Sequence, residues 1–213
     1  MTESFTTSDV ASLLVEVAND LESDSEELRA LDAAIGDGDL GITVQLASNA
    51  MRDCVASSTE TVVGRLIAQC GMSINKASPS TFGTLLASAF LAAGKAAQDK
   101  DRIDQHDLVL LGEAAVEGVK KRGKAEVGEK TMLDCLVPAV EAFKASTEGG
   151  SNLSHALQRA VTAAEAGLES TVNMQSQHGR ASWHGEKTVG VQDAGATAVY
   201  HLIESLSQHM RRQ

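Results

Sequence analysis

Apolar residues recur with the spacing of amphipathic helices along almost the whole chain. The first pattern covers Val10–Leu21, with Ser8 or Asp9 as the expected N-cap. No run of strict apolar–polar alternation is long enough to make strands dominate. We therefore predict one all-α domain over residues 1–213, with eight or nine helices. Beyond the first pattern, a short helix is expected from about Ser23, with Asp32 in its last turn. Further helices are expected over about 42–55, 61–74, 79–97, 104–123, 131–147, 153–172 and 195–210.

Local signals mark several helix boundaries. Ser23-x-x-Glu26 has the form of a capping box for a short second helix. Asp104 and Asp193 stand where an N-cap is expected, and Lys121-Arg122-Gly123 has the basic residues and glycine of a helix end. Pro138 is expected to bend or shift the helix that contains it.

The composition is that of an ordinary globular protein, with 43% hydrophobic and 22% charged residues. Aromatic residues make up only 3%, so the core must consist mainly of Ala, Leu, Val and Ile. The net charge of −11 disfavours non-specific binding to nucleic acid or to an anionic membrane. No apolar stretch approaches the roughly 20 residues that span a bilayer, and no signal peptide is recognisable. We expect a cytoplasmic protein.

The three cysteines, Cys54, Cys70 and Cys135, lie far apart in apolar helical patterns and form no C-x-x-C pair. This placement is typical of buried, reduced thiols rather than of disulfides or zinc ligands. His178 and His184 are also too far apart for a helical zinc motif. Neither a zinc site nor a Ser-His-Asp triad is indicated.

The richest chemistry lies in Leu31–Thr43, LDAAIGDGDLGIT. It places Asp32, Asp37 and Asp39 within eight residues, at the end of one predicted helix and before the next. The intervening glycines permit tight turns and a close approach of a ligand to the backbone. Carboxylates suit Mg²⁺, and a helix N-terminus suits an anion, so the stretch predicts a site for a metal-bound polyphosphate.

Two other interpretations of this stretch are a solvated turn and a calcium loop. Asp-Gly-Asp is common in turns, so the turn interpretation stays open. An EF-hand loop that began at Asp37 would need Gly at its sixth position and Glu at its twelfth, where this chain has Ile42 and Ser48. The EF-hand interpretation is excluded.

Four glycine-bearing loops, 36–41, 75–84, 123–131 and 179–195, are candidates for one site. Alternate connections of an up-and-down helical array meet at the same end, so we expect these loops to line one mouth. The third, GKAEVGEKT, is not a Walker A loop, because Glu129 intervenes before Lys130 and because a helix precedes it. Arg180, in the fourth, is a candidate phosphate ligand.

Together these loops resemble the nucleotide-binding L subunit of dihydroxyacetone kinases, which is equivalent to the C-terminal domain of the single-chain, ATP-dependent enzymes. The matching stretches are GDGDLG (36–41), NKAS…FGTLL (75–86), GKAEVGEKTMLD (123–134) and GRASWHGEKTVGVQDAGA (179–196). They are distributed over nearly the whole chain. The resemblance implies an antiparallel barrel of eight amphipathic helices with the nucleotide at one end.

The resemblance also implies a set of site residues. Asp32, Asp37 and Asp39 would coordinate two Mg²⁺ ions that bridge the phosphates of ADP or ATP, and no catalytic side chain beyond this metal–nucleotide site is implied. Met132 would pack on adenine. The expected nucleotide contacts are Leu40, Gly41, Ile42, Thr43, Ala77, Ser78, Gly123, Met132, Arg180, Asp193, Ala194 and Gly195.

In the dihydroxyacetone kinases that this chain resembles, a separate K subunit or domain holds the ketose. The chain is therefore expected to need that partner to complete the kinase reaction. In one branch a phosphotransferase-system phosphoprotein rephosphorylates tightly held ADP; in the other, ATP exchanges. A homodimer is compatible with the sequence.

Two departures from the family pattern are visible: Leu40 and Thr43 stand where many members have His and Asn, and the second loop reads Asn75–Ser80 instead of a glycine- and serine-rich run. They leave open the tightness of nucleotide binding and the ketose, either dihydroxyacetone or a relative such as erythrulose. They also motivate an alternative: a non-catalytic nucleotide-binding regulator or sensor with the same fold.

Overall fold

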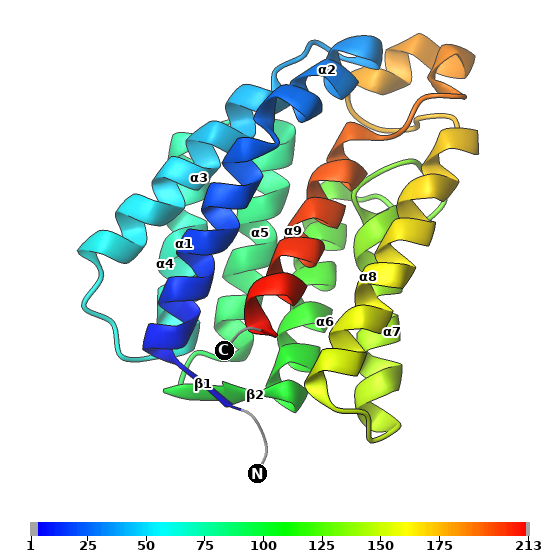
Figure 1. Ribbon diagram of the computed structural model, residues 1–213. Helices are drawn as coiled ribbons and strands as arrows, with labels where there is room; N and C mark the ends of the chain where they lie inside the picture. Colours follow the sequence, from blue (N-terminus) through cyan, green and yellow to red (C-terminus); the bar gives the residue numbers. More distant parts are fainter. Residues whose placement is uncertain (1–3, 212–213) are drawn as a thin grey trace.

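The computed structural model describes residues 4–211, which are mostly helical (Figure 1). The all-α prediction is confirmed for this part of the chain. Short 3-10 segments η1 and η2 cover Thr171–Asn173 and Arg180–Thr188, and strands β1 and β2 cover Ser4–Thr6 and Arg102–Asp104. The α-helices are α1 Thr7–Ser23, α2 Ser25–Ile35, α3 Leu40–Ser57, α4 Val63–Ala77, α5 Thr81–Ala96, α6 Gln105–Gly123, α7 Leu133–Glu148, α8 Leu153–Ser170 and α9 Ala194–Met210.

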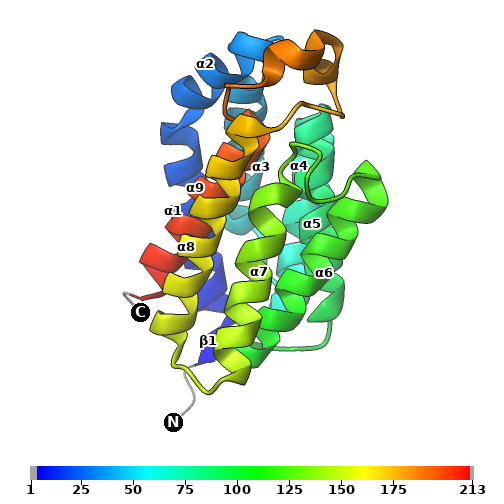
Figure 2. The same ribbon diagram turned by 90° about the vertical axis from the view of Figure 1, so that its right-hand side faces the viewer.

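The helices contact one another in a closed circuit. Helix α1 packs on α3, each helix from α3 to α8 packs on the next in the chain, and α9 packs on both α8 and α1. The shorter α2 rests on α3 and α9. The two perpendicular views show the long helices standing side by side around a common axis (Figures 1 and 2).

The connections alternate between the two ends of this bundle. The α2–α3, α4–α5, α6–α7 and α8–α9 connections lie at one end, which we call the site end (Figure 1). The opposite end, which carries β1 and β2, is called the strand end (Figure 1). The four glycine-bearing loops of the sequence fall on the four site-end connections, as predicted.

Small and aliphatic side chains fill the interior. The main core draws on every long helix, and a smaller cluster beneath the site end contains Leu21, Leu28, Leu40 and Val44. An apolar cavity of about 300 Å³ lies within the bundle, lined by α1 and by α4 to α9. Helices α4 and α5 approach closely because Gly64 faces α5: a Cβ there would lie 2.2 Å from Ala97.

Two predicted caps are confirmed and two are wrong. Asp104 accepts hydrogen bonds from the backbone N–H groups of His106 and Asp107, and Asp193 accepts one from Ala196. The cap of α1 is Thr6, rather than Ser8 or Asp9; Asp9 occupies the third helical position of its capping box.

The predicted Ser23-x-x-Glu26 box is also absent. Helix α1 continues to Ser23, whose hydroxyl donates to the carbonyl of Asp20 inside that helix, and α2 begins at Ser25 without a side-chain cap. Helix α7 begins two residues later than expected, at Leu133, and continues through Pro138; the bend there stays a prediction.

Strands β1 and β2 were not predicted. They pair antiparallel, with Phe5 opposite Ile103, and both side chains are 3% exposed. Three residues are too few for alternation to be recognised. The three cysteines are buried and free, as expected. Among the described residues, no helix is long and apolar enough to cross a membrane.

Candidate functional site

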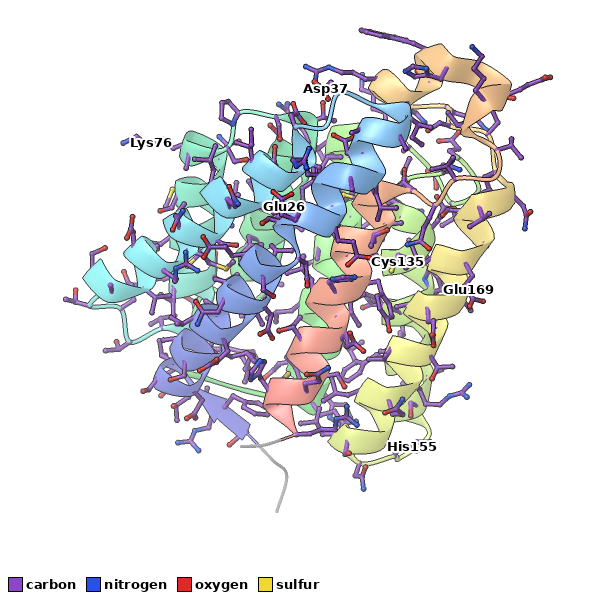
Figure 3. All side chains as sticks on the ribbon, turned by 45° about the horizontal axis from the view of Figure 1, so that its top comes forward. Glu26, Asp37, Lys76, Cys135, His155 and Glu169 are labelled. Carbon is purple, nitrogen blue, oxygen red and sulfur yellow. The ribbon has the colours of Figure 1, made fainter. Side chains whose placement is uncertain are left out.

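The acidic loop is placed as the sequence predicts. Asp32 lies in the last turn of α2, Asp37 lies in the loop, and Asp39 immediately precedes α3. One carboxylate oxygen from each of the three residues lies within 4.8 Å of the others. Figure 3 shows Asp37 on the α2–α3 loop at the site end, far from His155 at the start of α8. The three carboxylates therefore form one compact acidic cluster at the mouth of the bundle.

Glycines allow this loop to fold so tightly. A Cβ at Gly36 would lie 2.4 Å from a carboxylate oxygen of Asp32, and Gly38 adopts a φ of 73°, which favours glycine. The backbone N–H of Leu40 donates to Asp32 Oδ2 at 3.2 Å. The loop thus turns around the Asp32 carboxylate, and α3 begins directly beside it.

Arg180 brings positive charge to the acidic cluster from η2, 141 residues further along the chain. Its guanidinium forms ion pairs with Asp37 and with Asp39, the latter at 3.1 Å. Burial, and then the charge of Asp32, raise the pKa of Asp39. Because three carboxylates stand so close together, the cluster favours cations, and its all-oxygen donor set fits Mg²⁺.

The second loop is joined to the first by hydroxyl groups. Thr43 donates to Ser80 Oγ at 3.0 Å, and Ser78 donates to the carbonyl of Thr43 at 3.2 Å. Ser80 in turn accepts the backbone N–H of Gly83 and caps α5. Thr43 and Ser78 are almost fully buried, so their side chains support the loop from beneath.

The third loop is held by a residue that the sequence did not single out. The buried carboxylate of Asp134 accepts backbone N–H groups from Gly128 at 2.5 Å and from Thr131 at 2.7 Å. Glu129 lies 2.6 Å from Nε2 of His178, the residue directly before the fourth loop. Lys130, also not singled out, is buried and donates to the main-chain carbonyls of Thr171, in η1, and of Thr188, in the fourth loop.

The fourth loop ends at Asp193, the cap of α9. Burial raises the pKa of Asp193 to about 6, against the opposing effects of the Ala196 N–H group and the Lys130 charge. The Asp193 backbone N–H donates to Thr171 Oγ1 at 3.1 Å. The pKa of this carboxyl group at the start of α9 therefore lies above its usual range, and the charge of Asp32 in the acidic cluster contributes to raising it.

Hydrogen bonds and ion pairs thus bring the four loops together. Ile42 is 58% exposed, whereas Leu40 and Gly41 are buried at the start of α3. Met132, expected to pack on adenine, is 4% exposed and lies in the main core. Its contact with adenine, like the other expected contacts of Ala77, Ser78, Gly123, Ala194 and Gly195, stays a prediction.

Residues 34–208 match the DAK2 domain family. The chain belongs to this family. A related DAK2-domain protein, the ADP-binding subunit DhaL of the PEP-dependent dihydroxyacetone kinase of Escherichia coli, is 33% identical over 87% of this chain and 88% of its own length. The L-erythrulose 1-kinase of Mycolicibacterium smegmatis is also 33% identical, over 87% of this chain but only 33% of its own length.

The fold of this DAK2-domain protein matches a solved kinase structure. The dihydroxyacetone kinase from C. freundii, in complex with AMP-PNP and Mg²⁺, superposes with a TM-score of 0.75 at 26% identity. The match covers 98% of this chain and 35% of that kinase chain. The present chain therefore spans about a third of the solved enzyme.

Proposed function

We propose that this chain is the Mg-nucleotide-binding subunit of a dihydroxyacetone-type kinase, which supplies the phosphoryl group to a short ketose held on a separate K subunit. The observation that carries this proposal is the acidic cluster of Asp32, Asp37 and Asp39 at the mouth of the bundle, with Arg180 beside it. The name of the E. coli relative and the ligands of the C. freundii structure support the same assignment.

In this proposal the three aspartates hold two Mg²⁺ ions. Mg²⁺ would neutralise charge on the transferred phosphoryl group, which is the main requirement of phosphoryl transfer. Arg180 contributes charge-assisted hydrogen bonds to phosphate, and it must then release the carboxylates that it contacts.

The N-terminus of α3 (Leu40–Thr43), the second loop and the start of α9 surround the nucleotide. Leu40 belongs to the small apolar cluster, and the Thr43 hydroxyl bonds Ser80, so neither side chain is a free polar ligand. The backbone N–H groups of Leu40 and Thr43 already donate, to Asp32 Oδ2 and to the carbonyl of Asp39. The nucleotide is therefore held at this position through the backbone N–H groups of Gly41 and Ile42.

ADP as a tightly held cofactor, rephosphorylated by a phosphotransferase-system phosphoprotein, is the donor arrangement that we favour. The match to the ADP-binding subunit of the PEP-dependent E. coli kinase, which covers 88% of that subunit, supports this arrangement. The M. smegmatis relative keeps erythrulose beside dihydroxyacetone as a candidate ketose. A cytoplasmic location and a single domain over 1–213 belong to the same proposal, and a homodimer is one assembly to test.

The first test is native mass spectrometry of the purified chain, before and after dialysis against a chelator. We expect a mass increment of ADP plus two Mg²⁺ that survives purification and disappears on chelation. An empty protein that binds added Mg-ATP reversibly would support ATP as an exchanging substrate. Failure to bind either nucleotide would contradict the proposal.

The second test adds a K-type subunit, a short ketose and each donor in turn, and measures the ketose phosphate. Phosphoryl transfer to the ketose that depends on this chain would support the kinase subunit and argue against a nucleotide-binding regulator. Nucleotide binding without any transfer, in the presence of an active K-type subunit, would favour the regulator.

A further inference from the structure

Lys130 has an unusual environment for a lysine side chain. It is 1% exposed, and its ammonium group contacts four main-chain carbonyl oxygens: Thr171 at 2.8 Å, Met174 at 3.1 Å, Thr188 at 2.7 Å and Val191 at 2.5 Å. An ammonium group has only three N–H bonds, so it cannot donate a separate hydrogen bond to each of four oxygens. The four carbonyl oxygens are instead arranged around the charge, as ligands are arranged around a small cation. The contacts form a carbonyl cage around one positive charge.

The position of the cage in the chain gives it a second property. Thr171 and Met174 precede the part of the fourth loop that carries Arg180, and Thr188 and Val191 follow it. The ammonium therefore draws together the two limbs of an excursion from 174 to 188. The same neck is crossed by bonds from Ser176 N–H to Thr188 Oγ1 and from Gly190 N–H to the carbonyl of Val172.

This excursion delivers Arg180 to the acidic cluster, where its guanidinium meets Asp37 and Asp39. Lys130 itself contacts neither aspartate in any described hydrogen bond or ion pair. Its effect on the cluster can only be indirect, through the segment that it closes.

The loop that presents Lys130 is built to hold it there. Lys130 has a φ of 59°, a conformation that costs a lysine more than a glycine, and the Asp134 carboxylate fixes the residues on either side. Burial lowers the pKa of Lys130, and the Asp193 carboxylate opposes that change. A glycine at position 130 would adopt this positive φ with less strain, but it could not place an ammonium charge among the four carbonyl oxygens.

We propose that Lys130 is a positioning residue, a built-in monovalent cation whose carbonyl cage holds the Arg180 segment over the acidic cluster. The proposal rests on the proposed function for its consequence, namely tighter binding of Mg-nucleotide. When the side chain is removed, the same oxygens become a site for a small external cation, NH₄⁺ or K⁺. A large cation such as tetramethylammonium does not fit between carbonyls spaced for an ammonium.

The test compares Lys130→Gly with Lys124→Gly. Lys124 begins the same loop, is exposed and has a φ of 53°, so its replacement removes the same charge and the same backbone strain without affecting the cage. Trypsin provides a local measurement, since Arg180 and Lys187 are cleavage sites within the excursion. Mass spectrometry gives the cleavage rate at each site, and calorimetry gives the affinity for Mg-ADP.

We expect Lys130→Gly to keep its helical circular dichroism, to be cleaved at Arg180 and Lys187 at least about tenfold faster, and to bind Mg-ADP at least about tenfold more weakly. Ammonium chloride or potassium chloride should reverse a large part of both changes, whereas tetramethylammonium chloride at the same concentration should not. Lys124→Gly should behave as the wild type in all of these salts.

Cleavage and affinity that do not change, or changes that no small cation reverses, would overturn the proposal. Global unfolding of Lys130→Gly without recovery in ammonium would also overturn it, because Lys130 would then support the whole fold. If the wild type does not bind Mg-ADP, the proposed function fails, but cation-dependent protection of Arg180 and Lys187 in the variant still decides whether the cage exists.

Discussion

The two ends of the bundle differ in how they arrange charge. At the strand end, Asp104 caps α6, and Asp107 lies 2.5 Å from Lys100, so each carboxylate has a stabilising partner nearby in the chain. At the site end, Asp32, Asp37 and Asp39 are held within 4.8 Å of one another, and the single guanidinium of Arg180 pairs with Asp37 and Asp39. Three carboxylates beside one guanidinium leave a net negative charge in the acidic cluster, which favours a bound cation, whereas the strand-end carboxylates are each partnered locally.

Removal of one carboxylate from the acidic cluster should have the largest effect on this contrast. We expect Asp37→Ala to weaken Mg-ADP binding at least about 100-fold, since even partners outside the metal's own ligands are worth about 10–100-fold. The free energy of unfolding without ligand should change by less than about 1 kcal/mol, because the ion pair with Arg180 is exposed. Titration calorimetry and urea unfolding measure the two quantities.

The matched control is Asp101→Ala, which removes the same charge from an exposed position beside β2 at the strand end. It should leave the affinity for Mg-ADP unchanged. Equal affinities for Asp37→Ala and the wild type would show that the acidic cluster does not bind the metal.

The pH dependence of stability should single out Asp193 at the site end. Its pKa is about 6 in the folded protein and lies near 4 when the chain is unfolded, so it adds stability below pH 4 and loses it as the pH rises to 6. Asp193→Asn keeps an oxygen for the Ala196 N–H group but never ionises. As the pH rises from 4 to 6, the free energy of unfolding of the variant should therefore increase relative to that of the wild type, by about 1–3 kcal/mol.

Urea unfolding in the presence of a chelator, at several values between pH 4 and 7, gives both stability curves. Parallel curves for Asp193→Asn and the wild type would contradict this assignment. Such a result would place the titration on another carboxyl group.

Removal of the α6 cap at the strand end should lower the stability of the fold but not the affinity for Mg-ADP, the reverse of the effects expected for Asp37→Ala. Asp104→Ala loses the acceptor for two backbone N–H groups and should lower the free energy of unfolding by about 1 kcal/mol. The affinity for Mg-ADP should stay at the wild-type value in calorimetry. A large loss of affinity would mean that the two ends are energetically coupled.

The smallest expected effect is the reaction of the buried thiols Cys54, Cys70 and Cys135 with a thiol reagent. Burial raises the pKa of Cys135 to about 12 and also raises that of Cys70, so little thiolate forms near neutral pH. In the native protein a thiol reagent should label none of the three cysteines on the timescale of minutes, and all of them in urea. Rapid labelling of the native chain would indicate that the bundle opens.

The sequence predicts features that depend on neighbours in the chain. The caps at Asp104 and Asp193 follow from a polar side chain a few residues before an apolar pattern, and the acidic cluster lies within eight residues. The Ser23 cap fails for a local reason too: α1 runs two residues past its last apolar position, so the Ser23 hydroxyl is used inside it.

Contacts across long separations were beyond such rules. The acceptors of Lys130 are main-chain carbonyls 41 to 61 residues away, and any residue type would supply them. The pairing of Phe5 with Ile103 depends on a still larger separation along the chain. Resemblance to a family indicated which loops matter, but not which bonds hold them together.

The positions of β1 and of the C-terminal end of α9 limit how a partner can be joined covalently to this chain. Strand β1 lies at the strand end, and α9 runs from the mouth toward that end (Figure 1). Helix α1 alone, with 17 residues, is about 25 Å long. A tether from either place to the mouth therefore needs at least about eight fully extended residues. A fusion with a shorter linker would hold its partner at the wrong end of the bundle, so linker length becomes the controlling variable in any single-chain version.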